Sequence, residues 1–326
     1  MNKIVKIGTR DSQLAVWQAV LVQEQLQQHG IVSELVYIKS DGDIDLVTPL
    51  YEIGVQGIFT KTLDAALLSN RIDIAVHSMK DVPTQLAKGI TQAAVLPRAS
   101  YKDLLVYKEE GSELFTELGY TIGEWADYQN SKLKTQNSKF TIATSSTRRK
   151  AQWLNRYPHH TIENLRGNVN TRLRKVAESQ WHGAIFAAAG LERIGLRPEK
   201  SIELDWMLPA PAQGAIMIVC REEDTTTTDA CALLNDAVTA LCTKIERDFL
   251  RALFGGCSTP ISALAELKED TVFFRGNILS PDGKEKMELA INATVLQSAE
   301  LGTQAAKQLL EKGAGKIVAA IRDAGK

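Results

Sequence analysis

Short apolar runs alternate with amphipathic segments from the start of the chain to about residue 220. Continuous or alternating apolar residues predict strands, whereas apolar residues recurring every three or four positions predict helices. Up to residue 78 the predicted order is strand, helix, strand, helix, strand, at 3–9, 14–28, 33–39, 58–70 and 72–78. Asp11 or Ser12 is a suitable N-cap for the first helix, and Gly30 is suited to end it. This order is typical of a parallel or mixed sheet with helices on both faces.

The same rhythm resumes after a polar stretch. Residues 111–139 show no clear pattern, and we interpret them as a surface excursion. Further strands and helices are then predicted at 140–144, 145–157, 161–165, 168–179 and 183–189, with a third helix starting at residue 190. The apolar run within 208–222 predicts another strand, which could return the chain to the first sheet.

The last part of the chain follows a different order. It predicts a helix at 243–254, strands on both sides of the hairpin signal SPDG at 280–283, and a closing helix at 299–311. We therefore expect three domains: 1–99 plus 212–234, 100–211, and 235–326. The first two are doubly wound α/β units, and the third is a smaller α+β domain.

Composition narrows the class of protein. The chain has 326 residues, of which 44% are hydrophobic and 24% charged, as in an ordinary globular protein. A formal net charge of −1 gives no general reason to expect nucleic acid or a membrane as partner, so any basic site must be local. No run approaches the ~18 apolar residues of a membrane span, and the first residues lack the apolar block of a signal peptide. We therefore expect a cytoplasmic protein.

Basic residues recur where the predicted strands end. They are Arg10, Arg148, Arg149, Arg166, Arg172 and Arg193. A single arginine is more often a solvated surface residue, but in a doubly wound sheet the carboxyl ends of the strands form the ligand crevice. Several cations there, together with helix N-termini, predict a site for a polyanion. The RRK run at 148–150 could instead bind nucleic acid, although no aromatic residues are interleaved with it.

The stretch AVHSMKDVPTQ places Lys80 and Asp81 directly after a buried strand. Taken alone, the motif is more often a turn in which the aspartate bonds its own backbone and Pro83 fixes φ. In a crevice full of arginines, however, the Asp81 carboxylate could face a cationic intermediate and exchange protons. We interpret His77 as a core histidine.

Cys257 lies in LFGGCSTPIS, which is typical of a tight, exposed turn rather than of a core position. The four cysteines show no metal-ligand spacing, so we expect no zinc site and no disulfide framework. Neither a phosphate-binding loop nor a dinucleotide fingerprint is present. Either the thiol is incidental or something is attached to it.

Seven motifs resemble one known family in order and spacing. They are IGTRDSQLAVWQA, RIDIAVHSMKDVPT, ATSSTRRKAQ, LRGNVNTRL, AAGLERIGL, LPAPAQGA and GGCSTPI. This set is similar to that of the hydroxymethylbilane synthases, also called porphobilinogen deaminases, over nearly the whole chain. The resemblance implies two lobes like those of type II periplasmic binding proteins, with the active site in their cleft. It also implies a monomer that joins four porphobilinogen molecules head to tail, with loss of ammonia, and releases hydroxymethylbilane with water.

The resemblance also implies roles for individual residues. Cys257 would carry a dipyrromethane cofactor through a thioether. Lys80 and Asp81 match the catalytic pair, in which Asp81 would hold the pyrrole N–H groups, stabilise the azafulvenium and assist proton transfer. The residues that match carboxylate-binding positions are Arg10, Ser12, Arg148, Arg149, Arg166, Arg172 and Arg193. Ser146 and Asn168 match positions beside them, and Gln213 matches a position in the interdomain hinge.

One loop departs from the family pattern. Glu52 and Gln56 stand where relatives usually carry lysines that face the cofactor and substrate carboxylates, and Lys61 is a candidate to compensate. A different hypothesis is a two-lobed ligand-binding protein without chemistry, which would need neither Cys257 nor Asp81. A nucleic-acid binder would instead show affinity that falls steeply with salt.

Overall fold

A first α/β lobe is built on a five-stranded sheet. The computed structural model describes residues 4–39, 60–108, 112–121, 124–125, 139–254 and 259–324. In sheet order the strands are β2 (Ser33–Tyr37), β1 (Val5–Thr9), β3 (Ile74–Ser78), β12 (Ile216–Arg221) and β4 (Ile90–Val95). Strands β2, β1 and β3 are parallel, whereas β12 runs antiparallel to both of its neighbours. The predicted return of the chain to the first sheet is therefore confirmed.

The helices of the first lobe are α1 (Gln13–Gln28), α2 (Lys61–Leu68) and α7 (Thr225–Ala232). Ser12 is the N-cap residue of α1, but its hydroxyl accepts no capping hydrogen bond. Helix α1 ends as predicted before Gly30, whose φ of 74° suits glycine. Apolar side chains of α1, including Val22 and Leu26, pack on one face of the sheet, and Leu63 and Leu67 of α2 belong to a second apolar cluster. The alternating pattern of the sequence thus corresponds to a sheet covered on both faces.

The second lobe repeats this topology with different strands. In sheet order they are β9 (Thr161–Glu163), β8 (Thr141–Ala143), β10 (Gly183–Ala187), β5 (Asp103–Tyr107) and β11 (Ser201–Glu203). Its helices include α4 (Thr147–Arg156), α5 (Val169–Glu178) and the short α6 (Ala188–Glu192). Three strands are again parallel, and the fourth, β5, is antiparallel to both neighbours. Two connectors, at 96–102 and 204–215, join the lobes.

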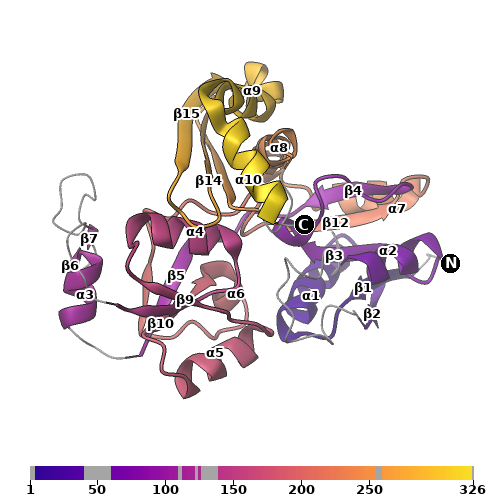
Figure 1. Cartoon of the computed structure of the whole chain (residues 1–326). Helices are drawn as coiled ribbons and strands as arrows, with labels where there is room; N and C mark the ends of the chain where they lie inside the picture. Colours follow the sequence, from indigo (N-terminus) through magenta and orange to yellow (C-terminus); the bar gives the residue numbers. More distant parts are fainter. Residues whose placement is uncertain are drawn as a thin grey trace.

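The C-terminal unit combines a three-stranded antiparallel sheet with helices (Figure 1). Its elements are α8 (Ala237–Ala252), β13 (Ile261–Lys268), β14 (Thr271–Leu279), β15 (Lys286–Thr294), the 3-10 helix η4 (Val295–Glu300), α9 (Leu301–Leu309), a π-helical turn η5 (Leu310–Ala314) and α10 (Gly315–Ala324). The SPDG hairpin is confirmed between β14 and β15. Phe249 of α8 and Phe274 of β14 meet edge to face in the core, with ring centroids 5.1 Å apart, a separation typical of a favourable aromatic pair. The expectation of two doubly wound lobes and a smaller α+β domain is confirmed.

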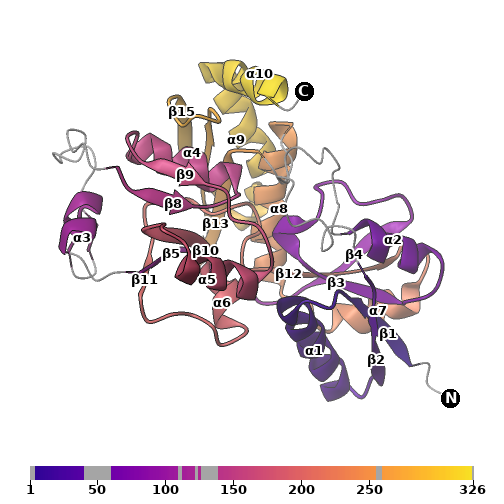
Figure 2. The ribbon, with the colours of Figure 1, turned by 60° about the horizontal axis from the view of Figure 1, so that its bottom comes forward.

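The expectation that the polar stretch after residue 111 has no pattern is wrong for part of it. Helix α3 (Ser112–Leu118) lies beside the second lobe in Figures 1 and 2, and the strand pair β6 (Tyr120–Thr121) and β7 (Glu124–Trp125) lies next to it in Figure 1. Leu114 and Leu118 are buried against a cluster that contains Trp153 and Tyr157. The apolar residues that anchor this segment are widely spaced among polar ones, so local periodicity did not reveal them.

Candidate active site

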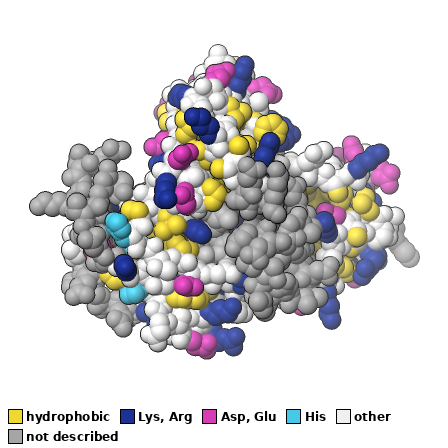
Figure 3. Space-filling view, in the orientation of Figure 1, with side chains coloured by type: hydrophobic (Ala, Val, Ile, Leu, Met, Phe, Trp, Pro, Cys, Tyr) yellow, Lys and Arg dark blue, Asp and Glu magenta, His cyan; other side chains and the backbone are white. Residues whose placement is uncertain are grey.

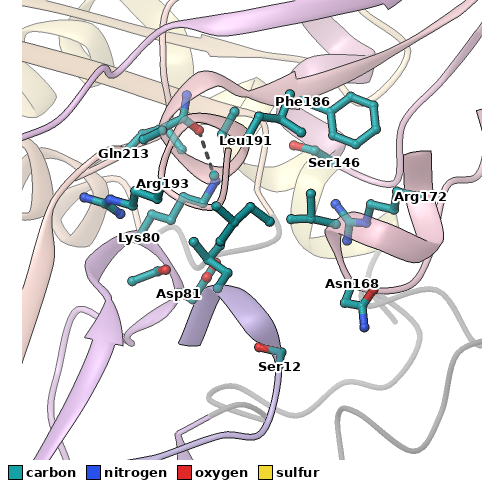
Figure 4. Close-up of a pocket in the computed structure, with 18 of the residues that line it drawn as sticks. Ser12, Lys80, Asp81, Ser146, Asn168, Arg172, Phe186, Leu191, Arg193 and Gln213 are labelled. Carbon is teal, nitrogen blue, oxygen red and sulfur yellow. Dashed lines mark hydrogen bonds between the residues drawn. The ribbon is translucent and has the colours of Figure 1, made fainter. Parts of the chain in front are cut away.

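A cavity of about 320 Å³ lies between the two lobes. Both sheets contribute the residues that follow their parallel strands: Arg10 follows β1, Lys80 and Asp81 follow β3, and Arg166 follows β9. The carboxyl ends of parallel strands are where open α/β sheets bind ligands. In Figure 4, Ser12, Lys80 and Asp81 lie on the first-lobe side, and Ser146, Asn168 and Arg172 on the side of the second lobe.

The structure brings most of the predicted site residues to this cavity. Those that line it are Arg10, Ser12, Lys80, Asp81, Ser146, Arg148, Arg149, Arg166, Asn168, Arg172, Arg193 and Gln213. Cys257, Glu52 and Gln56 lie outside the described residues. Lys61, at the start of α2, is exposed and is not among the residues that line the cavity. The twelve predicted residues that line the cavity thus come from distant parts of the chain to one place, as the sequence predicts.

The lining of the cavity is strongly basic. Among the described residues it carries seven cationic side chains and one carboxylate, that of Asp81. Burial lowers the pKa of Arg172 and of Arg193 to about 10, so both stay protonated at neutral pH. On the face shown in Figure 3, by contrast, Lys and Arg side chains are interspersed with Asp and Glu. The cavity lining thus differs from this mixed face, and its density of positive charge suits a ligand with several carboxylates.

Two ten-residue helices begin at the cavity. Ser146 is the N-cap of α4 and accepts a hydrogen bond from the Arg149 amide at 3.4 Å. Asn168 is the N-cap of α5 and accepts one from the Thr171 amide at 3.0 Å. Gly167, at φ 113°, allows the sharp turn before this cap. Ser146 and Asn168 thus have a structural role as caps, and the helix ends add partial positive charge to the cavity.

Lys80 lies half-buried in the short 3-10 turn η2 (Met79–Asp81). Its Nζ donates a hydrogen bond to Gln213 Oε1 at 3.2 Å, drawn as a dashed line in Figure 4. Burial and then the nearby Arg149 lower the pKa of Lys80 to about 8. The ammonium is therefore protonated at neutral pH but close to its titration range.

Asp103 is a residue that the sequence analysis missed. It is fully buried at the start of β5, where its carboxylate accepts hydrogen bonds from Arg148 Nη1 and Arg149 Nη2, both at 2.7 Å. Gln213 Nε2 donates to the same carboxylate at 2.9 Å. An acidic residue opening an otherwise apolar strand, DLLVY, is the signal that could have revealed it.

Arg148 and Arg149, which share the Asp103 carboxylate, are also held by backbone carbonyls. Arg148 also donates to the Leu208 carbonyl at 2.9 Å, and Arg149 to the Ile185 carbonyl at 3.0 Å. One carboxylate offsets one of the two guanidinium charges, and the remaining contacts fix both side chains. The pair is thus a preorganised part of the cavity wall with a single net positive charge.

Arg193 and its surroundings join the lobes. Arg193 Nη2 donates to the Gly214 carbonyl at 2.7 Å in the second connector, and its guanidinium carbon lies 5.7 Å from the centre of the Trp17 ring on α1. At the N-terminal ends of α1 and α5, Asn170 Nδ2 donates to Gln13 Oε1 at 2.9 Å. These contacts hold the lobes together across the cavity.

His77 is a buried, neutral residue of the first sheet. It is 7% exposed on β3, and burial lowers its pKa to about 4, so it is neutral at physiological pH. The interpretation of His77 as a core histidine is confirmed, because its side chain is buried.

The first described residue after Cys257 that approaches the site is Thr259. Thr259 and Ile261 line a small second cavity together with Lys80, Arg148 and Leu250. The C-terminal unit therefore meets the two lobes beside Lys80, at the chain segment that directly follows the predicted attachment site.

The fold and the site together define a class: a two-lobed α/β protein with a strongly basic cleft, whose described lining residues include one carboxylate. Comparison with known families is more specific. Residues 5–229 match the model of "porphobilinogen deaminase, dipyromethane cofactor binding domain", and residues 240–311 match that of "porphobilinogen deaminase, C-terminal domain". The chain belongs to the porphobilinogen deaminase family.

Individual relatives agree with the family models. A porphobilinogen deaminase of Syntrophotalea carbinolica is 40% identical over 324 residues, covering 98% of this chain and 96% of the relative. One of Chlorobium phaeobacteroides is 38% identical over 330 residues, covering 99% of both. Among solved structures, an ancestral cationic amino acid solute binding protein gives a TM-score of 0.42 at 13% identity, over 70% of this chain and 86% of that one. The family assignment rests on the sequence matches.

Proposed function

We propose that the protein joins four porphobilinogen molecules head to tail and releases the linear tetrapyrrole hydroxymethylbilane. Each porphobilinogen carries an acetate and a propionate, so the growing chain is a polyanion. The observation that best supports this proposal is the cavity, whose described lining residues provide seven cationic side chains and one carboxylate, that of Asp81. A ligand-binding protein of the same fold would not need that carboxylate among the cations.

The residues present fit a dipyrromethane cofactor, which we propose is attached to Cys257 through a thioether. The group would bring four carboxylates, and Arg10, Arg166 and Arg172 line the same cavity as Lys80 and Asp81. When bound, it supplies the nucleophilic pyrrole carbon on which the chain is extended. The three described cysteines are buried, and burial raises the pKa of Cys231 to about 12 and that of Cys242 to about 11. These thiols are poor nucleophiles at neutral pH, because the thiolate is the reactive form.

In each condensation the C–N bond of the substrate's aminomethyl group breaks and ammonia leaves. A C–C bond to the chain's terminal ring carbon forms, and that carbon loses its proton. We propose that the Asp81 carboxylate stabilises the positive charge on the substrate pyrrole and assists the proton transfer. The arginines at the cavity, with Ser12, Ser146 and Asn168, orient the carboxylates, and Lys80 adds positive charge beside Asp81.

Three further features are part of the proposal. The domain limits 1–99 plus 212–234, 100–211 and 235–326 are supported by the sheets to which β12, β5 and β13 belong. Among the described residues, no helix is long and apolar enough to cross a bilayer. We propose a monomer in the cytoplasm, with porphobilinogen as its small-molecule substrate.

The cofactor assignment is tested by intact-protein mass. Wild-type protein expressed in a haem-producing host should be heavier than its sequence by two linked pyrrole units, and Cys257→Ser should lack that mass. Cys242→Ser is the matched control, because Cys242 is 4% exposed and far from nucleophilic at neutral pH. An unmodified wild-type mass in protein that still converts porphobilinogen contradicts the assignment.

The role of Asp81 is tested by turnover. Asp81→Ala should abolish porphobilinogen consumption while leaving circular dichroism and the thermal unfolding midpoint close to those of the wild type, since Asp81 is only half-buried. Asp11→Ala, an exposed carboxylate that precedes α1, is the control and should retain activity. Normal turnover by Asp81→Ala would remove Asp81 from the mechanism.

A further inference from the structure

Arg247 of α8 contacts the turn that carries Lys80 and Asp81. Its Nη1 donates to the Val82 carbonyl at 2.9 Å and to the Met79 carbonyl at 3.3 Å. Its Nη2 donates to the Pro83 carbonyl at 2.6 Å. One side chain of the C-terminal unit therefore holds three backbone carbonyls of the first lobe, that of Met79 in the turn and those of Val82 and Pro83 directly after it.

The turn has little support of its own. It is a single 3-10 turn of three residues, closed by the hydrogen bond from the Val82 amide to the Met79 carbonyl at 3.1 Å. The Met79 amide donates to the Ala215 carbonyl at 3.0 Å, at the end of the second connector. Short 3-10 segments have poorer hydrogen-bond geometry than α-helices, so contacts from outside contribute much to their position.

Helix α8 is a rigid base for this contact. Ile245 and Phe249, on either side of Arg247, are fully buried in the core of the C-terminal unit. The preceding residue, Glu246, accepts hydrogen bonds from the Ala212 amide at 2.6 Å and from the Ala265 amide at 2.8 Å. Consecutive residues of α8 thus contact the connector and the catalytic turn, and Leu250, one turn further on, lines the small cavity that Lys80 also lines.

We infer that Arg247 is a positioning residue that fixes the Lys80–Asp81 turn relative to the C-terminal unit. This inference rests on the proposed function, in which the C-terminal unit carries the dipyrromethane cofactor and Asp81 acts where the chain on that cofactor is extended. A guanidinium suits the role because its planar fork directs two nitrogens at separate acceptors. An ammonium is a point charge and cannot reach all three carbonyls in the same geometry. Arg247 acts through the turn and does not line the main cavity among the described residues.

The test compares holoenzymes that carry the dipyrromethane cofactor. Arg247→Gln should lower kcat about 10- to 100-fold, because a displacement of catalytic groups by about 1 Å can cost that much, whereas KM should change less than about threefold. Amide hydrogen exchange at residues 79–83 should become faster. Arg247→Lys should give an intermediate kcat. The control is Arg251→Gln, one turn along α8, where the side chain is 61% exposed and pairs with Asp248; it should leave kcat and exchange unchanged.

Several results would overturn the inference. They are an unchanged kcat in folded Arg247→Gln, a raised KM with unchanged kcat, or a lower kcat without faster exchange at residues 79–83. If neither Arg247 variant accumulates as folded protein, Arg247 is a folding residue and the inference is also wrong. Failure of the wild type to convert porphobilinogen would instead refute the proposed function, so the two hypotheses are distinguished.

Discussion

Replacing Asp103 by asparagine should destabilise the second lobe strongly. The change keeps the shape of the side chain but leaves the buried Arg148 and Arg149, 4% and 5% exposed, without their shared counter-charge. Removing one partner of a buried ion pair typically costs about 3–5 kcal/mol, because the remaining charge is left uncompensated away from water. We expect the free energy of unfolding at pH 7 to fall by that amount.

Urea unfolding followed by tryptophan fluorescence measures this loss, because Trp153 and Trp206 lie in the same lobe. The matched control is Asp205→Asn, whose carboxylate pairs with Lys102 and is 49% exposed. Exposed pairs contribute about 0–1 kcal/mol, so this variant should remain close to the wild type. Equal unfolding free energies for Asp103→Asn and the wild type, within about 1 kcal/mol, would refute the reasoning.

The destabilisation caused by Asp103→Asn should also depend on pH. Burial alone would raise the pKa of Asp103, but Arg148 and Arg149 hold it well below its usual range. A carboxyl with a lowered folded pKa stabilises the protein fully above its ordinary pKa of about 3.9, and this contribution is lost as the pH falls toward the folded value. The difference between the wild type and Asp103→Asn should therefore be constant from pH 7 to about pH 5 and should narrow below about pH 4. A constant difference down to pH 3 would contradict the assignment of the charge.

Two further changes have clear expected outcomes. Because burial and neighbouring arginines lower the pKa of Lys80 to about 8, kcat/KM for porphobilinogen should decline as the pH rises through 8. In Lys80→Arg this decline should move to higher pH. Identical pH profiles for the wild type and Lys80→Arg would show that another group titrates. Gly302→Ala places a Cβ 2.0 Å from the Ile245 carbonyl oxygen where α9 crosses α8, so the free energy of unfolding in urea should fall by about 1–3 kcal/mol. The control is Gly315→Ala, whose Cβ would have nothing within 4 Å and which should leave the free energy of unfolding unchanged. Equal losses in the two variants would contradict the packing argument.

The sequence predicted those features that depend on local pattern. The alternation of strands and helices, and the arginines at strand ends, follow from residue spacing that is visible within a short window. The Asp103–Arg148–Arg149 cluster could not be predicted, because its members are 45 and 46 positions apart and pair only when β5 joins the second sheet. The contact between Arg247 and the Val82 carbonyl spans 165 positions and involves the backbone of the partner segment, which carries no sequence signal.

The segment formed by residues 112–121 and 124–125 illustrates a different limit of prediction from local pattern. Its anchoring residues are scattered among polar ones, and they are buried only because Trp153, Tyr157 and Trp206 of distant segments supply the other half of the cluster. Burial of this kind depends on tertiary packing, which overrides the local pattern.

The position of β12 has a consequence for synthesis of the chain on the ribosome. The gap between β3 and β4 in the first sheet is filled only by residues 216–221, after the whole second sheet has been translated. At about 5–20 residues per second, roughly 6–25 s pass between the emergence of β4 and that of its partner. During that time the nascent first lobe presents unpaired strand edges, which are sites of mispairing. The lobe nearest the N-terminus is thus completed only after the second lobe, and the growing polypeptide has a window in which chaperone binding would be most useful.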